Sequence, residues 1–307
     1  MKPAVIDEVL RKLTEVYKDI TAHKGSVHSY LGQTFDFSLP KRVKVTMEGY
    51  VNDMLEEYEI EGCAATPAVD KLFSIDDESK SLSKELAEDY HSRVAKMLYL
   101  AKRVRPDILT AIAFLSTRVR GPTEQDWEKL ERLLKYINCT KDMGICLETG
   151  DQFEVLAYVD ASFAVHGYMK SHTGGVISLG KGPVYVKSSK QKLTSKSSTE
   201  AELIGVSDLL PQVIWTREFL EQQGYSCGPA KVFQDNQSTI VLANKGYSTS
   251  DKTRHIGIRY FFVKDRIDAG EVVVEYLPTE DMVADAMTKP LQGSLFRKLR
   301  SVLMNYE

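Results

Sequence analysis

Four acidic residues in the second half of the chain each interrupt an otherwise apolar run. They are Asp160 in "AYVDAS", Glu202 in "EAELIGV", Asp235 in "VFQDNQ" and Asp285 in "MVADAM". A buried, ionised carboxylate without a partner is costly, so such a group pairs, shifts its pKa or binds a metal ion. A lone Asp at a strand end is commonly a turn former. Four such interruptions together favour a metal site.

The type of ligand indicates which metal such a site would hold. Carboxylate oxygens suit the hard Mg²⁺ ion, whereas Zn²⁺ prefers Cys and His ligands, and neither residue adjoins these acids. Two Mg²⁺ ions roughly 3.5–4 Å apart can activate a water and stabilise the leaving oxygen of a phosphodiester. We therefore expect two Mg²⁺ ions as cofactor, with Mn²⁺ able to substitute, and phosphodiester hydrolysis as the chemistry.

The predicted start of a helix gives two neighbouring glutamates different roles. Ser197 and Glu200 have the S-x-x-E spacing of a capping box, which engages Glu200 at the helix end. Glu202 then lies further into the helix and faces a different side. We expect Glu202 to be the metal ligand and Glu200 to be structural.

A basic strip lies between these acids in the sequence. Residues 181–199, "KGPVYVKSSKQKLTSKSST", contain five lysines and no acid, although the whole chain has a net charge of only −3. Such a strip beside an acidic site is what a nuclease needs to hold phosphates. The alternative is a solvated strand edge on which lysines block aggregation.

The elements that carry these residues change in pattern near residue 150. Before it, helical periodicity dominates, with one strand pair around the turn "LPKR". After it, the order is β-β-β-α-β-α-β-α, with final helices over "TEDMVADAMTK" and "GSLFRKLRSVLM". The crossover makes the first and fourth strands parallel in a mixed sheet, so Asp160 and Asp235 end neighbouring strands. The expected fold class is mixed α/β.

Bulk properties narrow the setting. A length of 307 residues suits two domains, and there is neither a signal peptide nor a membrane-spanning run. The four cysteines contain no CxxC pair, so we expect neither a zinc ribbon nor a disulfide framework. The expectation is a soluble intracellular protein in a reduced compartment, without a membrane partner. The polar segment 65–83 reads as a mobile connector.

Taken together, the motifs are similar to a known family. "YVDASFA", "SKQKLTSKSSTEAELIGV", "VFQDNQSTIVLA", "TRHIGIRYFFVKD" and "LPTEDMVADAMTKPL" resemble the ribonuclease H domain of Ty1/copia-type retrotransposon Pol polyproteins. Upstream, "HSYLGQTFDFS" resembles the last palm segment of a copia-type reverse transcriptase, and residues 99–145 resemble its thumb and connection. The implied domains are 1–150 (palm remnant and thumb), 151–293 (ribonuclease H-like, with a mixed five-stranded sheet) and 294–307 (a basic amphipathic helix).

The resemblance implies an activity and its residues. The family's metal-binding catalytic acids fall on Asp160, Glu202, Asp235 and Asp285, and its reaction is hydrolysis of the RNA strand in RNA:DNA hybrids. The partners would be that hybrid and an upstream reverse transcriptase palm and fingers. Polar groups beside the acids would contact phosphates and 2′-hydroxyls of the hybrid. These are Lys187, Ser188, Ser189, Lys190, Lys192, Lys196, Ser198, Asn236 and Gln237.

The run Tyr158-Val159-Asp160-Ala161 also resembles the Tyr-x-Asp-Asp turn of a polymerase, with alanine at the second acid. The resemblance instead makes this run the first ribonuclease H strand and puts the polymerase turn upstream of Met1. We therefore do not expect the fragment to polymerise DNA alone.

Histidines offer little to this chemistry. Bacterial-type ribonucleases H carry a histidine in the loop before the last acid, and "YLPTEDMVAD" has none. His166 and His172 read as surface-loop residues. The pair Arg254-His255 matches a family motif whose role the residues do not explain.

Two other functions remain open from the sequence. The spacing of Asp235 and Glu271 mimics that of an integrase-like strand transferase, although Glu271 opens a strand rather than lying within a helix. The chain can also be a non-catalytic relic of a retrotransposon that only binds nucleic acid. All four acids are present in the sequence, which argues against the loss of the catalytic site that a non-catalytic relic would show.

Overall fold

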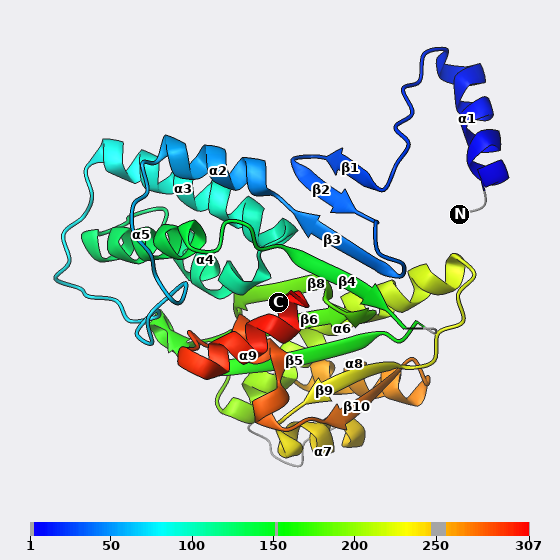
Figure 1. Cartoon of the computed structure of the whole chain (residues 1–307). Coiled ribbons are helices and arrows are strands. Elements are labelled where there is room, and N and C mark those ends of the chain that lie inside the picture. The colour runs from blue at the N-terminus through cyan, green and yellow to red at the C-terminus, as the bar shows by residue number, and fades with distance from the viewer. Residues whose placement is uncertain (1–2, 151–152, 247–255, 307) are drawn as a thin grey trace.

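The structure is a computed structural model that describes residues 3–150, 153–246 and 256–306 (Figure 1). Within these residues the strands form two five-stranded sheets. No helix in the described part of the chain is long and apolar enough to cross a membrane. The predicted mixed α/β class is confirmed.

The first sheet is antiparallel and comes mostly from the first half of the chain. Its order is β1 (Val27–Tyr30), β2 (Gln33–Asp36), β3 (Arg42–Thr46), β4 (Ile145–Thr149) and β7 (Gly180–Lys181). The strand pair predicted around "LPKR" is β2 and β3. Because β7 belongs to the second half, this sheet joins the two halves of the chain.

Helices make up the rest of the first half, as the periodicity predicts. They are α1 (Pro3–Tyr17), α2 (Glu48–Glu57), α3 (Lys84–Arg103), η1 (Pro106–Ile108), α4 (Leu109–Ser116) and α5 (Glu124–Asn138). Helix α5 begins directly after its N-cap Thr123, which forms a capping box with Asp126.

The second sheet is mixed and carries the predicted topology. Its order is β10 (Val272–Tyr276), β9 (Ala230–Gln234), β5 (Leu156–His166), β6 (Lys170–Ser178) and β8 (Pro183–Lys190). Strands β5, β6 and β8 are antiparallel neighbours, whereas β9 is parallel to both β5 and β10. The first and fourth strands of this unit are therefore adjacent and parallel.

Helices and short turns cover both faces of the mixed sheet. They are η2 (Gly167–Met169), α6 (Ser198–Gln222), α7 (Gln237–Lys245), α8 (Gly257–Asp268), η4 (Thr279–Asp281), η5 (Val283–Met287) and α9 (Gly293–Met304). Leu209 of α6 packs on Gly175 of β6, and η5 packs on the neighbouring Gly174. Because adjacent strand residues point to opposite faces, α6 and η5 lie on opposite sides of the sheet.

The segment "TEDMVADAMTK" differs from the helix predicted for it. It forms the two short 3₁₀ turns η4 and η5 rather than an α-helix. These turns hold Asp285 against the sheet, and α9 follows them.

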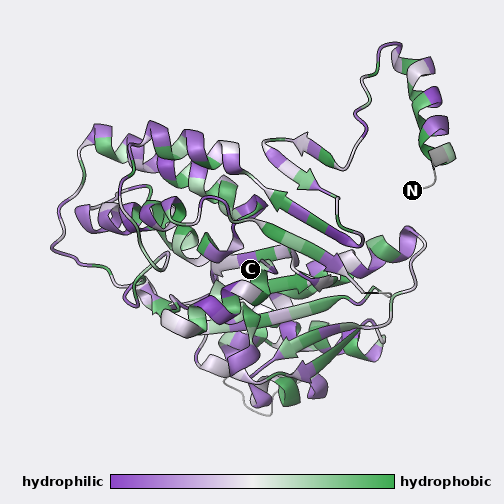
Figure 2. Cartoon of the chain, viewed as in Figure 1, coloured by the Kyte–Doolittle hydropathy of each residue, from purple (hydrophilic) through white to green (hydrophobic). Residues whose placement is uncertain are grey.

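Buried side chains form two cores, and one of them extends across residue 150. The larger core contains Met97, Ile112 and Leu133 of the first half, together with Val176 of β6 and Phe296 of α9. The smaller core lies between α6, α8 and the mixed sheet. Figure 2 shows the hydrophobic strands of the mixed sheet at the centre of the molecule. The larger core therefore contains residues from both sides of residue 150.

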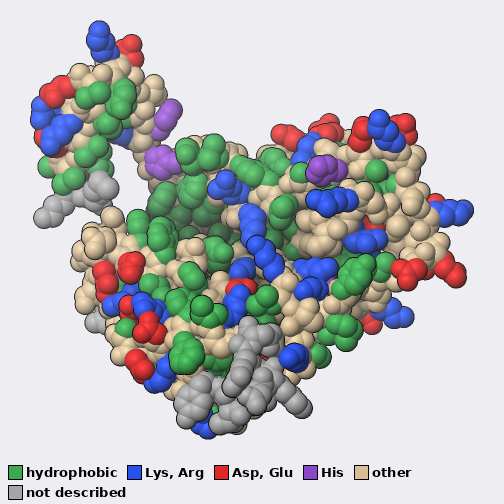
Figure 3. All heavy atoms as spheres, turned by 180° about the vertical axis from the view of Figure 1, so that it is seen from behind, with side chains coloured by type: hydrophobic (Ala, Val, Ile, Leu, Met, Phe, Trp, Pro, Cys, Tyr) green, Lys and Arg blue, Asp and Glu red, His purple; other side chains and the backbone are tan. Residues whose placement is uncertain are grey.

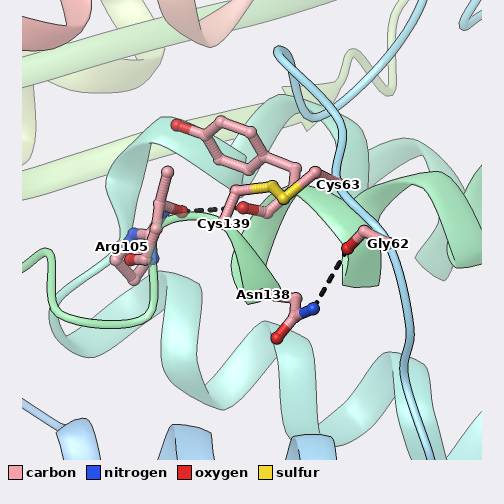
Figure 4. The surroundings of a disulfide bond; sticks show 7 residues. Gly62, Cys63, Arg105, Asn138 and Cys139 are labelled. Atoms are coloured by element: carbon pink, nitrogen blue, oxygen red, sulfur yellow. Dashed lines mark hydrogen bonds between the residues drawn. A yellow bond between two sulfur atoms is a disulfide. The ribbon is translucent and has the colours of Figure 1, made fainter.

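The expectation that the cysteines form no disulfide was wrong for one pair. A disulfide joins Cys63 to Cys139 at the end of α5, where their Cα atoms are 5.4 Å apart although 76 residues separate them in sequence (Figure 4). The Asn138 side-chain amide also donates to the Gly62 carbonyl oxygen, at 3.0 Å. The spacing of the cysteines carried no sign of this pair, because chain folding alone brings them together.

The connector prediction was also wrong in part. Ala68 and Leu72 are buried in the larger core. The Thr66 hydroxyl lies 3.0 Å from the side-chain oxygen of Gln292, near the C-terminus. A few apolar residues in this polar segment are therefore enough to hold it against the molecule.

Helix α1 forms as predicted, but its apolar face is not covered. Val5, Val9, Leu13 and Val16 are all exposed. Helix α1 lies apart from the rest of the described chain, with hydrophobic and charged side chains on its surface (Figures 1 and 3).

Candidate active site

Three of the four predicted acids meet at one edge of the mixed sheet. Asp160 lies in β5, Asp235 directly follows β9, and Asp285 lies in η5. One carboxylate oxygen from each lies within 4.8 Å of the others. The arrangement can hold a divalent cation.

The sheet register explains why two of these acids meet. Tyr158 of β5 pairs with Phe233 of the parallel strand β9. Asp160 and Asp235 each come two residues later, so they lie at the same level on adjacent strands. Asp285 reaches them from the side because η5 packs tightly on Gly174, the residue that pairs with Asp160.

Two of the three clustered acids are buried, and burial perturbs their protonation. Asp160 is 2% exposed and Asp285 is 3% exposed. Burial and, to a smaller extent, the nearby charge of Asp160 raise the pKa of Asp285 to about 6. Burial also raises the pKa of Asp160, although Lys289 and Thr288 oppose that rise. Carboxylates in this state gain stability from a bound cation.

Glu202 lies beside the three clustered acids and is buried in α6. The Gln234 side-chain amide donates to a Glu202 oxygen at 3.1 Å. Burial raises the pKa of Glu202 well above its usual value, and the charge of Asp160 adds to the effect. Glu202 therefore interacts electrostatically with the cluster, although it is not one of the three residues whose oxygens converge.

Glu200 has the capping role predicted for it. The Glu200 backbone N–H donates to the Ser197 hydroxyl at 3.2 Å, and the Glu200 carboxylate accepts from the Lys196 backbone N–H at 2.6 Å. The start of α6 thus directs Glu200 to the cap and leaves Glu202 on the sheet side.

Sequence reasoning missed several residues that hold the acids. The Lys289 ammonium is 2.7 Å from an Asp285 oxygen and 3.5 Å from an Asp160 oxygen. The Thr288 hydroxyl donates to Asp160, and the Thr279 hydroxyl donates to Asp235 at 2.9 Å. One signal was available, because Lys289 follows Asp285 by four residues, a common spacing for ion pairs.

Gln234 is a further missed residue, fully buried at the end of β9. Its side-chain oxygen accepts from the backbone N–H groups of Asp235 and Asn236, at 2.9 and 3.0 Å. Its amide donates to Glu202. Gln234 thus links the turn that carries Asp235 to the helix that carries Glu202.

A cleft of about 390 Å³ opens beside the acids. Connector residues Asp70, Phe73 and Ser74 form one side, and the other side includes Ser162 and Lys289. The cleft provides solvent access next to an otherwise buried cluster.

The predicted nucleic-acid contacts are spread over several environments. Lys190, Lys192, Lys196, Ser198 and Gln237 are exposed, whereas Ser189 and Asn236 are half-buried. Lys187 is also half-buried, and its ammonium donates to the Asp208 carbonyl oxygen at 3.2 Å. Asn236 caps α7 by accepting from the Thr239 backbone N–H.

Ser188 differs from that prediction. It is buried and donates to the Met287 carbonyl oxygen at 2.7 Å, and its hydroxyl also lies 2.7 Å from His172 Nε2. Ser188 of β8 pairs with Gly174 of β6, and η5 packs against Gly174. Ser188 therefore points to the face of the sheet that η5 covers. Its hydroxyl therefore does not face a nucleic acid.

The assignment of the histidines to a surface loop was wrong. His166 is 7% exposed and His172 is 1% exposed, and their ring nitrogens lie 2.8 Å apart. Phe73 of the connector packs edge-on against His166. The pair Arg254-His255 lies outside the described residues.

The geometry does not support the integrase-like set of acids. The Ala230 backbone N–H donates to the Glu271 carbonyl oxygen at the start of β9, whereas Asp235 follows the end of β9. Glu271 instead pairs with Arg266, at 3.2 Å. The two acids are at opposite ends of one strand and cannot share an ion.

Fold and site together define an α/β protein with a cluster of carboxylates where strand β9 ends beside β5. The chain is similar to the Pol polyproteins of transposons RE2 and RE1 from Arabidopsis thaliana, at 32% and 33% identity over 68% and 69% of its length. It is also 24% identical to the Ty1-NL2 Gag-Pol polyprotein from Saccharomyces cerevisiae over 89% of its length. Its homologues are Ty1/copia Pol polyproteins, which confirms the resemblance read from the motifs.

The matched region covers 14% of the RE1 and RE2 polyproteins and 16% of the Ty1 polyprotein. No protein-family model matches the chain. Among solved structures, it is similar to LC11-RNase H1 from compost, at 15% identity and a TM-score of 0.35, over 45% of this chain and 94% of that one. RNase H1 from Halobacterium salinarum gives 18% identity and a TM-score of 0.30, over 44% and 94%. The strand order and the parallel and antiparallel pairings of the two sheets define the fold of this chain.

Proposed function

We propose that this chain is a metal-dependent endonuclease of the ribonuclease H type, which hydrolyses the RNA strand of RNA:DNA hybrids during retrotransposon reverse transcription. The observation that carries the proposal is the convergence of Asp160, Asp235 and Asp285 within 4.8 Å. Three separate segments supply these acids, and the homologues are retrotransposon Pol polyproteins.

The donor set fits Mg²⁺ or Mn²⁺, because all of its ligands are carboxylate oxygens. Asp160, Asp235 and Asp285, with Glu202 beside them, would hold the metal ions. Bound metal ions would supply an activated water and neutralise charge at the leaving oxygen. The raised pKa values of Asp160, Glu202 and Asp285 are the expected state of such ligands without a cation.

Other side chains would position the ligands and the substrate. Thr288 and Gln234 hold Asp160 and Glu202 through single hydrogen bonds, which limits their rotation. The exposed Lys190 and Lys192, at and just after the end of β8, would meet phosphates of the hybrid. An upstream palm and fingers would extend that contact in a longer Pol protein.

The test measures cleavage of a labelled RNA:DNA hybrid in Mg²⁺ by the wild-type chain and by Asp235→Asn. The wild type should cut only the RNA strand and leave duplex DNA intact. Asp235→Asn should lower the cleavage rate more than about 100-fold. A loss of that size exceeds the usual effect of removing a residue that only hydrogen-bonds a metal ligand. Hybrid binding in the absence of metal should change little, because only one ligand charge is removed.

Asp53→Asn provides the matched control, because Asp53 is exposed on α2 and the amide replacement is the same. This variant should cut like the wild type. Equal cleavage by Asp235→Asn and wild type would overturn the site assignment. Hybrid binding without cleavage by the wild type would support the non-catalytic relic instead.

A further inference from the structure

Lys289 has an unusual position for a lysine, since its ammonium lies among the acids of the candidate metal site. It is 2.7 Å from Asp285 Oδ1 and 3.5 Å from Asp160 Oδ1. The side chains of these two acids are only 5% and 3% exposed, whereas the Lys289 side chain is 37% exposed. The lysine therefore reaches inward from the surface.

The acids need a counter-charge when no metal is bound. Within the described residues, the ion pairs of Asp160 and Asp285 are both made with Lys289. A buried carboxylate without an opposite charge is strongly destabilising. The Lys289 ammonium, in contact with both carboxylates, supplies that opposite charge.

The surroundings allow the lysine to leave. Lys289 lines the 390 Å³ cleft together with Ser162 and residues of the connector. Its backbone N–H is held by the Asp285 carbonyl oxygen at 2.9 Å, which fixes the base of the side chain. Rotation about side-chain bonds can move the ammonium into the cleft without a change in the fold.

We propose that Lys289 is a built-in counter-ion of the acid cluster, which divalent metal ions displace into the cleft when they bind. The inference rests on the proposed metal site. It adds that a residue of the chain itself competes with metal ions for that site. Lys289 stabilises the metal-free protein and lowers its apparent affinity for Mg²⁺, because both cations compete for the same oxygens. It acts on the ligands and is a positioning residue.

The experiment compares Mg²⁺ binding to the wild type, Lys289→Met and Lys289→Arg by isothermal titration calorimetry at fixed pH and ionic strength. Lys289→Met removes the charge at similar length and should bind Mg²⁺ at least about tenfold more tightly, because a charge near 4 Å interacts strongly at a partly buried site. Lys289→Arg keeps the charge and should stay closer to the wild type. Lys84→Met, at an exposed position of α3, is the matched control and should bind like the wild type.

Thermal unfolding supplies a second readout that does not depend on activity. Without metal, Lys289→Met should unfold at a lower temperature than the wild type, and saturating Mg²⁺ should narrow the difference. Equal or weaker Mg²⁺ binding by a folded Lys289→Met would overturn the counter-ion proposal. Absence of Mg²⁺ binding in every variant would instead overturn the metal site itself.

If Lys289→Met does not fold, the proposal can be tested on the wild type, by recording NMR spectra of the protein with ¹³Cε-labelled lysine. Lys289→Arg identifies the Lys289 signal by removing it. That signal should move on addition of Mg²⁺, because the ammonium loses its carboxylate partners. A signal that stays in place while Mg²⁺ binds would overturn the proposal.

Discussion

At the scale of single residues, burial sets the charge state of two histidines. His172 Nδ1 lies 2.8 Å from His166 Nε2, and His172 Nε2 lies 2.7 Å from the Ser188 hydroxyl. Burial lowers the pKa of His166 to about 4 and, together with the charge of His166, lowers the pKa of His172 to about 3. Both rings are therefore neutral at pH 7.

We expect His172 to make the folded protein sensitive to acid. In the unfolded chain histidine binds a proton below a pKa of about 6.5, whereas folded His172 does not until about 3. The contribution of His172 to the free energy of unfolding is therefore largest above pH 6.5 and decreases as the pH falls below that value. Between pH 7 and pH 5 it should lose about 2 kcal/mol of unfolding free energy.

Urea unfolding at both pH values tests this expectation in the wild type, His172→Gln and His91→Gln. The buried acids act in the opposite direction, because their raised pKa values favour folding as the pH falls. The informative quantity is thus the difference between variants. His172→Gln should lose less stability on acidification than the wild type, and the exposed His91→Gln should match the wild type. An unchanged pH dependence in His172→Gln would contradict the assignment.

At the scale of elements, the site depends on the close approach of η5 to the mixed sheet. A Cβ atom at Gly174 of β6 would lie 2.6 Å from Thr288 Cγ2, 2.7 Å from Met287 Cβ and 2.9 Å from the Ala284 carbonyl oxygen. These contacts are too short for any side chain. Glycine at this position therefore allows η5 to bring Asp285 to Asp160.

We predict that Gly174→Ala pushes η5 outward and weakens the metal site. Overpacking of this kind costs about 1–3 kcal/mol, so Mg²⁺ affinity should fall about tenfold as Asp285 moves away. Calorimetric titration with Mg²⁺ measures the effect. Gly228→Ala, where the new methyl group meets open space, should leave affinity unchanged. Wild-type affinity in Gly174→Ala would show that η5 does not position Asp285.

At the scale of the whole molecule, the two halves of the chain share their larger core. The Thr110 hydroxyl of α4 donates to the Ala286 carbonyl oxygen of η5 at 2.6 Å, and Arg300 of α9 donates to the Tyr136 hydroxyl at 3.0 Å. Apolar residues of η5 and α9 pack with those of α3, α4 and α5. We therefore expect the halves to unfold together.

The two tryptophans can test this cooperativity, because Trp127 lies in α5 and Trp215 lies in α6. In Trp215→Phe the fluorescence reports on the first half, and in Trp127→Phe it reports on the second. In each variant the urea midpoint from fluorescence should coincide with that from far-UV circular dichroism. Separate midpoints would indicate that the halves are independent domains.

Local sequence signals predict most of the elements and the three acids that converge. Ser197 and Glu200 start α6, and glycines at 246 and 270 end their helices in the left-handed region. Such signals act over three or four residues, so they can be read locally. The interrupted apolar runs likewise mark Asp160 and Asp235, although Asp160 lies within β5 and only Asp235 follows the end of its strand.

Contacts between side chains that are distant in sequence follow only from the folded arrangement. The disulfide of Cys63, the burial of His172, the inward turn of Ser188 and the ammonium of Lys289 all depend on partners far away in sequence. Thr288, for example, donates to an acid 128 residues earlier. Contacts of this kind follow from how sheets and turns pack, and no local pattern encodes them.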